Sequence, residues 1–89
     1  MTNRNRELAN HFDTDNRINQ LQEECAELIC IANHFRRGRC GKDSVAKEMA
    51  DVKVTMEQTA YKLGITEKLI NEIADMKIGR ALERREWEK

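Results

Sequence analysis

Apolar residues recur every three or four positions along two long stretches of this chain, and this spacing restricts the fold more than any other feature. The first stretch spans residues 16–37, and its stripe is Ile18, Leu21, Cys25, Leu28, Ala32 and Phe35. The second spans residues 44–63, and its stripe is Val45, Met49, Val52, Met56, Ala60 and Leu63. Such spacing gives an α-helix one apolar face. The 89 residues contain no proline, so no helix is interrupted by a missing backbone N–H group.

Side chains that can cap helices stand at the expected helix starts. Asp13 or Asp15 can cap the first helix and Ser44 the second, because their oxygens accept free N–H groups of a first turn. Thr66 can cap a third helix, which we expect to run to about Arg85.

The fold class predicted from these patterns is all-α, a small bundle of three main helices. Gly64 can end the second helix in the left-handed conformation. Residues 1–14 are polar and form either a loose N-terminal arm or a short helix, and residues 15–89 form a single helical domain. Because so short a chain buries a limited core, we expect oligomerisation to complete the bundle. A weaker apolar strip around Val54 either faces another subunit or is ordinary surface.

Charge and cysteine content exclude several classes of protein. The 16 basic and 16 acidic residues balance, which argues against a general nucleic-acid binder. No stretch approaches the roughly 18 apolar residues that span a bilayer, and residues 1–12 lack the apolar core of a signal peptide. The three cysteines show no CxxC spacing, so neither a disulfide framework nor structural zinc is expected. Free thiols are typical of a reducing compartment, so we expect a cytoplasmic protein without membrane contact.

Two acidic clusters carry the chemistry that the sequence suggests. The first is Glu23, Glu24 and Glu27, and the second is Glu48 and Asp51. Spacings of three or four residues place each cluster on one side of a helix, where like charges repel by about 0.2–0.5 kcal/mol per pair. Only Asp51 has a basic residue at such a spacing, whereas ordinary solvated helices pair their glutamates in this way. The alternatives are a solvated surface and a site for a hard divalent cation such as Mg²⁺.

The direction of these side chains favours the cation site. Glu24 and Glu48 each lie about 70° from the centre of their helix's apolar stripe, at 100° per residue. If the two helices pack antiparallel, both clusters can face one cleft, with Glu27 and Asp51 further round on the same sides. Glu23 points most nearly outward and therefore ranks below the other four.

Basic residues of the third helix continue its apolar face. After Ile73, Lys77, Arg80 and Arg84 follow at spacings of 4, 3 and 4. Cations near unpaired carboxylates suit a phosphate ligand bridged by metal. The alternative is direct pairing of these basic side chains with glutamates of the other helices.

The order of these motifs resembles the MazG-like all-α nucleoside triphosphate pyrophosphohydrolases. The motifs are EECAE at 23–27, EMAD at 48–51 and KIGRALER at 77–84, and the resemblance covers about residues 16–86. It implies Mg²⁺-dependent hydrolysis of nucleoside triphosphates to monophosphate and pyrophosphate, with Mn²⁺ as a possible substitute. It also implies a homodimer or homotetramer. The chain departs from the family at Lys53-Val54-Thr55, where many relatives have an apolar run.

The resemblance also implies a role for each candidate residue. Four carboxylates would be the metal ligands: Glu24, Glu27, Glu48 and Asp51. Glu23 would support them as a further ligand or orient water, so that Glu23, Glu24 and Glu27 form the catalytic set. The phosphate-binding residues would be Lys77, Arg80 and Arg84. Metal-activated water would attack the α-phosphorus.

Two other functions remain open from the sequence. One is phosphoribosyl-ATP pyrophosphohydrolase activity, since a related family has similar carboxylate helices. The other is a non-catalytic helical module that uses its stripes for coiled-coil pairing. Divalent metal should raise the melting temperature of either enzyme and leave that of the module unchanged.

Overall fold

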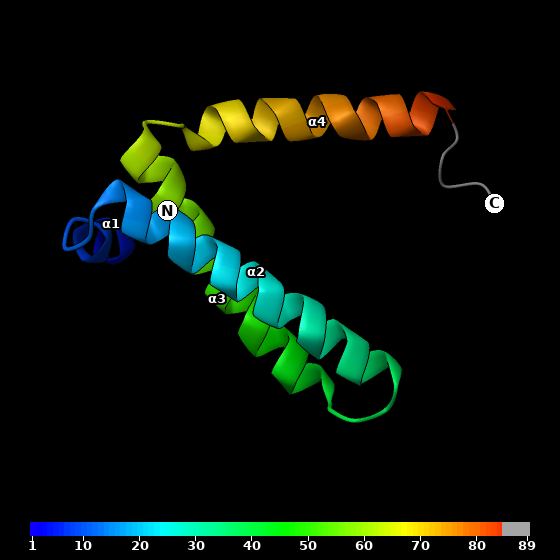
Figure 1. The fold of residues 1–89 in the computed structure, drawn as a ribbon. Coiled ribbons are helices and arrows are strands. Elements are labelled where there is room, and N and C mark those ends of the chain that lie inside the picture. The colour runs from blue at the N-terminus through cyan, green and yellow to red at the C-terminus, as the bar shows by residue number, and fades with distance from the viewer. Residues whose placement is uncertain (85–89) are drawn as a thin grey trace.

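The computed structural model describes residues 1–84, and these form four α-helices and no strands (Figure 1). The helices are α1 (Asn3–Ala9), α2 (Thr14–Arg36), α3 (Lys42–Leu63) and α4 (Glu67–Arg84). The predicted all-α class is confirmed. The predicted end of the last helix at Arg85 lies outside the described residues.

Local capping chemistry sets where α2 and α3 begin. The backbone N–H of Asn16 donates to the Asp13 side chain at 2.7 Å, so Asp13 caps α2. α3 instead begins after Gly41, whose backbone is extended and which has no side-chain cap bond. The predicted Ser44 cap is therefore wrong: the helix starts earlier, and the Ser44 N–H already donates to the Gly41 carbonyl oxygen at 3.2 Å.

The junction between α3 and α4 follows the sequence prediction. Gly64 takes the left-handed conformation with a φ of 72°, which favours glycine. The next amide, that of Ile65, donates back to the Ala60 carbonyl oxygen at 2.8 Å, an arrangement that closes a helix end. Thr66 then caps α4 by accepting from the Leu69 N–H at 3.1 Å.

Helices α2 and α3 form an antiparallel hairpin (Figure 1), and the most deeply buried side chains of these two helices are polar. Thr55, Gln58 and Thr59 are the buried residues of α3. By contrast, Met49 of the predicted apolar stripe is 56% exposed and Met56 is 43% exposed. At 100° per residue the buried residues lie to one side of that stripe. The two helices therefore leave much of their apolar surface uncovered.

Hydrogen bonds around a buried arginine hold the seam between α2 and α3 together. The Arg17 guanidinium donates to the Gln58 side-chain oxygen at 2.7 Å and stacks 3.8 Å from the centre of the Phe12 ring. The Gln58 amide donates in turn to the Asn5 side chain of α1 at 2.7 Å. The Thr59 hydroxyl lies 3.1 Å from the carbonyl oxygen of Arg17. This network joins α1, α2 and α3 at one end of the hairpin.

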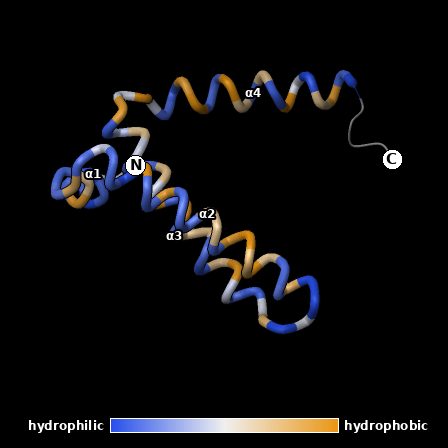
Figure 2. Tube along the Cα trace, viewed as in Figure 1, coloured by the Kyte–Doolittle hydropathy of each residue, from blue (hydrophilic) through white to orange (hydrophobic). Residues whose placement is uncertain are grey.

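Helix α4 diverges from the hairpin, and none of its side chains is buried (Figure 1). Its apolar residues alternate with polar ones along the whole length of the helix (Figure 2). Exposed apolar residues include Leu69, Ile70, Ile73, Met76, Ile78 and Leu82. The predicted bundle of three main helices is therefore not confirmed within one chain.

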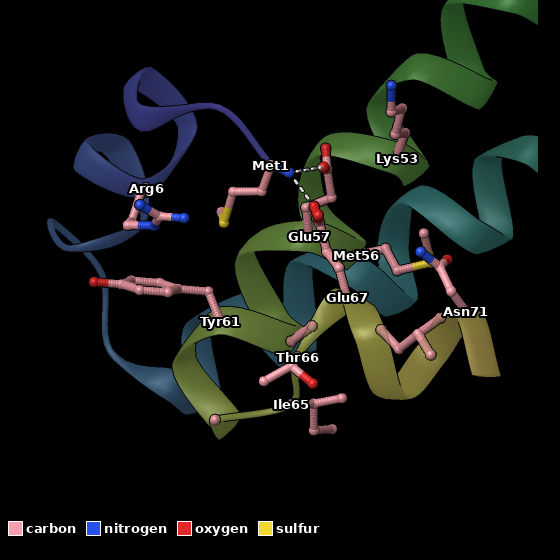
Figure 3. Close-up of a pocket in the computed structure, with 13 residues that line it drawn as sticks. Met1, Arg6, Lys53, Met56, Glu57, Tyr61, Ile65, Thr66, Glu67 and Asn71 are labelled. Carbon is pink, nitrogen blue, oxygen red and sulfur yellow. Dashed lines mark hydrogen bonds and ion pairs between the residues drawn. The ribbon is translucent and has the colours of Figure 1, made fainter. Parts of the chain in front are cut away.

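A groove of about 840 Å³ lies where α1, α3 and α4 meet (Figure 3). Tyr61, Ile65 and Ile70 belong to its lining. At its rim the α-amino group of Met1 forms ion pairs with Glu57, at 3.4 Å, and with Glu67. Through Met1, these ion pairs link the first turn of α4 to the second half of α3.

Candidate metal centre

Four carboxylates from the two helices of the hairpin converge on one point. They are Glu24 and Glu27 of α2 and Glu48 and Asp51 of α3, and one oxygen from each lies within 4.8 Å of the others. The antiparallel pairing brings the two acidic clusters together across the seam. The helix faces that pack there are rotated from the predicted apolar stripes toward Glu24 and Glu48. The sequence placed these residues at the flank of the seam, and the structure places them in it.

The neighbouring turn of α2 helps to orient this group. The side-chain amide of Gln20 donates to Glu24 Oε1 at 2.8 Å. Gln20 precedes Glu24 by four residues, so the two side chains lie one above the other on the helix. Sequence reasoning missed this residue, although its spacing was a usable signal.

Two oxygens of the group are buried without any hydrogen-bond partner in the described residues: Glu24 Oε2 and Glu48 Oε2. Met1 and Lys68 form ion pairs with Glu57, Glu67 and Glu72, and none of these ion pairs involves the four converging carboxylates. A buried charged oxygen without a partner is costly. The cluster therefore carries negative charge that the described part of the chain does not compensate.

The repulsion within the group bears most directly on the pKa of Glu27. The negative charge of Glu24 raises the pKa of Glu27 above its ordinary value, and desolvation by neighbouring atoms and the charge of Glu48 add to the rise. A carboxylate in such a position gains from a proton or from a cation.

The donor set suits a hard divalent cation. All four side chains offer carboxylate oxygens, which Mg²⁺, Mn²⁺ and Ca²⁺ prefer, whereas softer metals prefer sulfur or imidazole ligands. Cys25 follows Glu24 directly but is not among the converging residues, and all three cysteines are free thiols. The residues present therefore fit a magnesium site.

Glu23 stands apart from this group. It is exposed and is not one of the four converging carboxylates. Its position next to Glu24 on α2 leaves it at the edge of the site, so its role in orienting water stays a prediction.

The predicted phosphate-binding residues lie elsewhere in the chain. Lys77, Arg80 and Arg84 line a shallow hollow on α4 together with Ala81. Figure 1 shows that α4 diverges from the part of the hairpin that carries the carboxylates. The structure thus gathers the three basic residues but does not bring them to the acidic group of the same chain. Their contact with phosphate stays a prediction.

Comparisons of the chain with protein-family models, with curated proteins and with solved structures gave no match. Among residues 1–84, no helix is both long and apolar enough to cross a membrane.

Proposed function

We propose that this protein is a Mg²⁺-dependent nucleoside triphosphate pyrophosphohydrolase of the MazG-like kind, which converts (d)NTP to (d)NMP and pyrophosphate. The observation that supports this proposal most is the convergence of four carboxylate oxygens within 4.8 Å. The two buried oxygens without partners add to it, because a cation would compensate them. Metal ions held by carboxylates are a common means of hydrolysing phosphoanhydrides.

Each candidate residue has a distinct task in this reaction. Glu24, Glu27, Glu48 and Asp51 would hold the cation. When bound, Mg²⁺ supplies an activated water and neutralises charge on the phosphates. Glu23, exposed beside the cluster, would orient the attacking water. The bond from the water oxygen to the α-phosphorus forms, and the bond from the α-phosphorus to the oxygen bridging to the β-phosphate breaks. The products are the monophosphate and pyrophosphate, and no protein nucleophile takes part.

The test is pyrophosphate release from a panel of ribo- and deoxynucleoside triphosphates, with Mg²⁺, with Mn²⁺ and with EDTA. We expect metal-dependent release with the monophosphate as co-product, and loss of release in Glu48→Gln. Glu72→Gln is the matched control, because Glu72 is exposed on α4 and pairs only loosely with Lys68 at 3.9 Å. If no nucleotide releases pyrophosphate at enzyme concentrations near that of the substrate, the proposal is wrong. Phosphoribosyl-ATP belongs in the panel, since release from it alone would favour the second enzyme.

The proposal extends to assembly and location. We place the enzyme in the cytoplasm, because free thiols are typical of a reducing compartment. We expect a homodimer or homotetramer, because six large apolar side chains of α4 are exposed in the single chain. The same exposed surface supports a second candidate, a non-catalytic helical interaction module. A melting temperature that does not respond to Mg²⁺ or Mn²⁺ would favour the module.

A further inference from the structure

The two carboxylate oxygens of Glu24 have different surroundings. Glu24 Oε1 accepts a hydrogen bond from the side-chain amide of Gln20 at 2.8 Å, whereas Glu24 Oε2 is buried without a hydrogen-bond partner in the described residues. An ionised carboxylate only accepts hydrogen bonds, so Gln20 must turn its NH₂ group, and not its oxygen, toward Glu24. One oxygen of this carboxylate is therefore engaged by Gln20, and the other is free for a cation.

The same hydrogen bond restricts how the Glu24 carboxylate can turn. Gln20 stands one turn before Glu24 on α2, and Glu27 of the converging group stands on the turn after it. Both Gln20 and Glu24 are half-buried, so water competes less for this hydrogen bond than it would at an exposed site. For Glu24 to bind a cation through both oxygens, Oε1 would have to leave the Gln20 amide. With the hydrogen bond intact, Glu24 offers a cation only Oε2.

Divalent cations differ in whether they use the second oxygen of a carboxylate. Mg²⁺ binds about six oxygens in a near-octahedral arrangement at about 2.0–2.1 Å, and it usually keeps several water molecules. Ca²⁺ is larger, binds about 6–8 oxygens at about 2.3–2.6 Å and often takes both oxygens of one carboxylate. A carboxylate that is restricted to one oxygen therefore suits Mg²⁺ better than Ca²⁺.

We infer that Gln20 is a positioning residue that limits Glu24 to binding a cation through one oxygen, and that it thereby makes the four converging carboxylates select Mg²⁺ over Ca²⁺. The inference rests on the proposed function for the presence of the cation and on the hydrogen bond between Gln20 and Glu24 for the selectivity. Gln20 acts through Glu24 and does not itself contact the cation.

A purely structural role for Gln20 makes a different prediction. A side-chain hydrogen bond between residues four apart also stabilises a helix without any ligand. If that were its whole role, removal of the Gln20 amide would lower the metal-free melting temperature and would weaken the binding of Mg²⁺ and Ca²⁺ alike. The ratio of the two affinities therefore separates selection of a cation from support of the helix.

Gln20→Met is the variant that tests the inference, because methionine is close to glutamine in length and has no N–H donor. Gln22→Met is the matched control, since Gln22 is exposed on the same helix and lies about 200° around it from Glu24. Melting temperatures across separate titrations with Mg²⁺ and with Ca²⁺, without nucleotide, give the dissociation constant of each cation for each protein.

We expect Gln20→Met to shift the ratio of the two dissociation constants by about tenfold or more in favour of Ca²⁺, because loss of a residue that orients a metal ligand typically costs about 10–100-fold in affinity. Mg²⁺ should bind more weakly, whereas Ca²⁺ should keep its affinity or gain from the second oxygen of Glu24. Gln22→Met should keep both wild-type constants. An unchanged ratio in Gln20→Met overturns the inference and leaves the metal centre in place. A wild type that responds to neither cation overturns the metal centre and the inference with it.

Infrared spectroscopy tests the mode of binding directly. The antisymmetric and symmetric stretching bands of a carboxylate move closer together when both of its oxygens bind one cation. The difference spectrum between Ca²⁺-loaded and metal-free protein should therefore show a narrower separation of these bands in Gln20→Met than in the wild type. Identical difference spectra for the two proteins overturn the inference.

Discussion

Replacement of Glu48 by glutamine should stabilise this protein in the absence of metal and should remove its stabilisation by Mg²⁺. Glu48 Oε2 is buried without a partner, and its carboxylate lies within 4.8 Å of that of Glu24. Two unit charges at this distance repel by about 1 kcal/mol in water and about 3.5 kcal/mol at the effective dielectric constant near a protein surface. The amide of glutamine removes this repulsion and can donate a hydrogen bond to Glu24 Oε2.

The metal-free variant should therefore be more stable than the wild type by about 1–3 kcal/mol. For a domain of this size, 1 kcal/mol corresponds to a shift of about 4–8 °C in melting temperature. With Mg²⁺ at ten times its dissociation constant, the wild type should gain about 1.4 kcal/mol, whereas the variant should gain nothing. The difference between the melting temperatures of the variant and the wild type should therefore shrink by the equivalent of about 1.4 kcal/mol when this concentration of Mg²⁺ is added.

Thermal melts followed by circular dichroism, in EDTA and across a Mg²⁺ titration, measure both effects. Glu72→Gln serves as the control and should leave both melting temperatures within about 2 °C of the wild type, because an exposed ion pair contributes little. A metal-free Glu48→Gln protein that melts below the wild type, or one that keeps the full Mg²⁺ shift, would refute the electrostatic account of the cluster.

Three further results are expected. Glu23→Gln should keep most of the Mg²⁺ shift and lose most of the hydrolysis rate, because Glu23 lies outside the converging group; loss of the melting shift would make it a ligand. The raised pKa of Glu27 means that its stabilising contribution is full below the ordinary glutamate pKa and is lost as pH rises through the folded-state value. Without metal, the melting temperature should therefore fall as the pH rises through this range, and Glu27→Gln should reduce this dependence on pH. An unchanged dependence on pH in the variant would show that Glu27 is not its cause. Gln58→Ala should cost about 2–4 kcal/mol in urea denaturation, since it leaves the buried Arg17 guanidinium short of an acceptor, and a loss below about 1 kcal/mol would argue against the network.

The parts of the fold that depend on local chemistry could be predicted from the sequence. Asp13, Gly64 and Thr66 act within one turn of the helix ends that they define, so the local sequence is enough to predict their roles. Ser44 failed as a cap because Gly41 already supplies an extended backbone one turn earlier.

The rotation of the α2–α3 seam could not be predicted from apolar periodicity. Periodicity assumes that the most apolar face is the packed one, but Arg17 donates a hydrogen bond to Gln58 across the seam, and both residues are buried. Polar groups with partners can be buried, and the sequence does not reveal which ones will find a partner.

The candidate site was only partly predictable for a related reason. The four carboxylates occupy fixed spacings on adjacent helices joined by a short loop, which brings them together in an antiparallel hairpin. Lys77 and Arg80 lie on a helix whose direction depends on tertiary contacts beyond Gly64, and helical spacing carries no information about that direction.

The hydrogen bonds at the end of the hairpin fix the register of α2 against α3. Apolar faces can slide past each other by one helical turn with little loss of packing energy. The hydrogen bonds of Gln58 and Thr59 with Arg17 form in only one alignment of the two helices. A slip of one helical turn is about 5.4 Å, which exceeds the 4.8 Å over which the four carboxylate oxygens gather. The network thus fixes the alignment of the two helices and with it the positions of the four carboxylates. A cation would bind there without first having to align the helices.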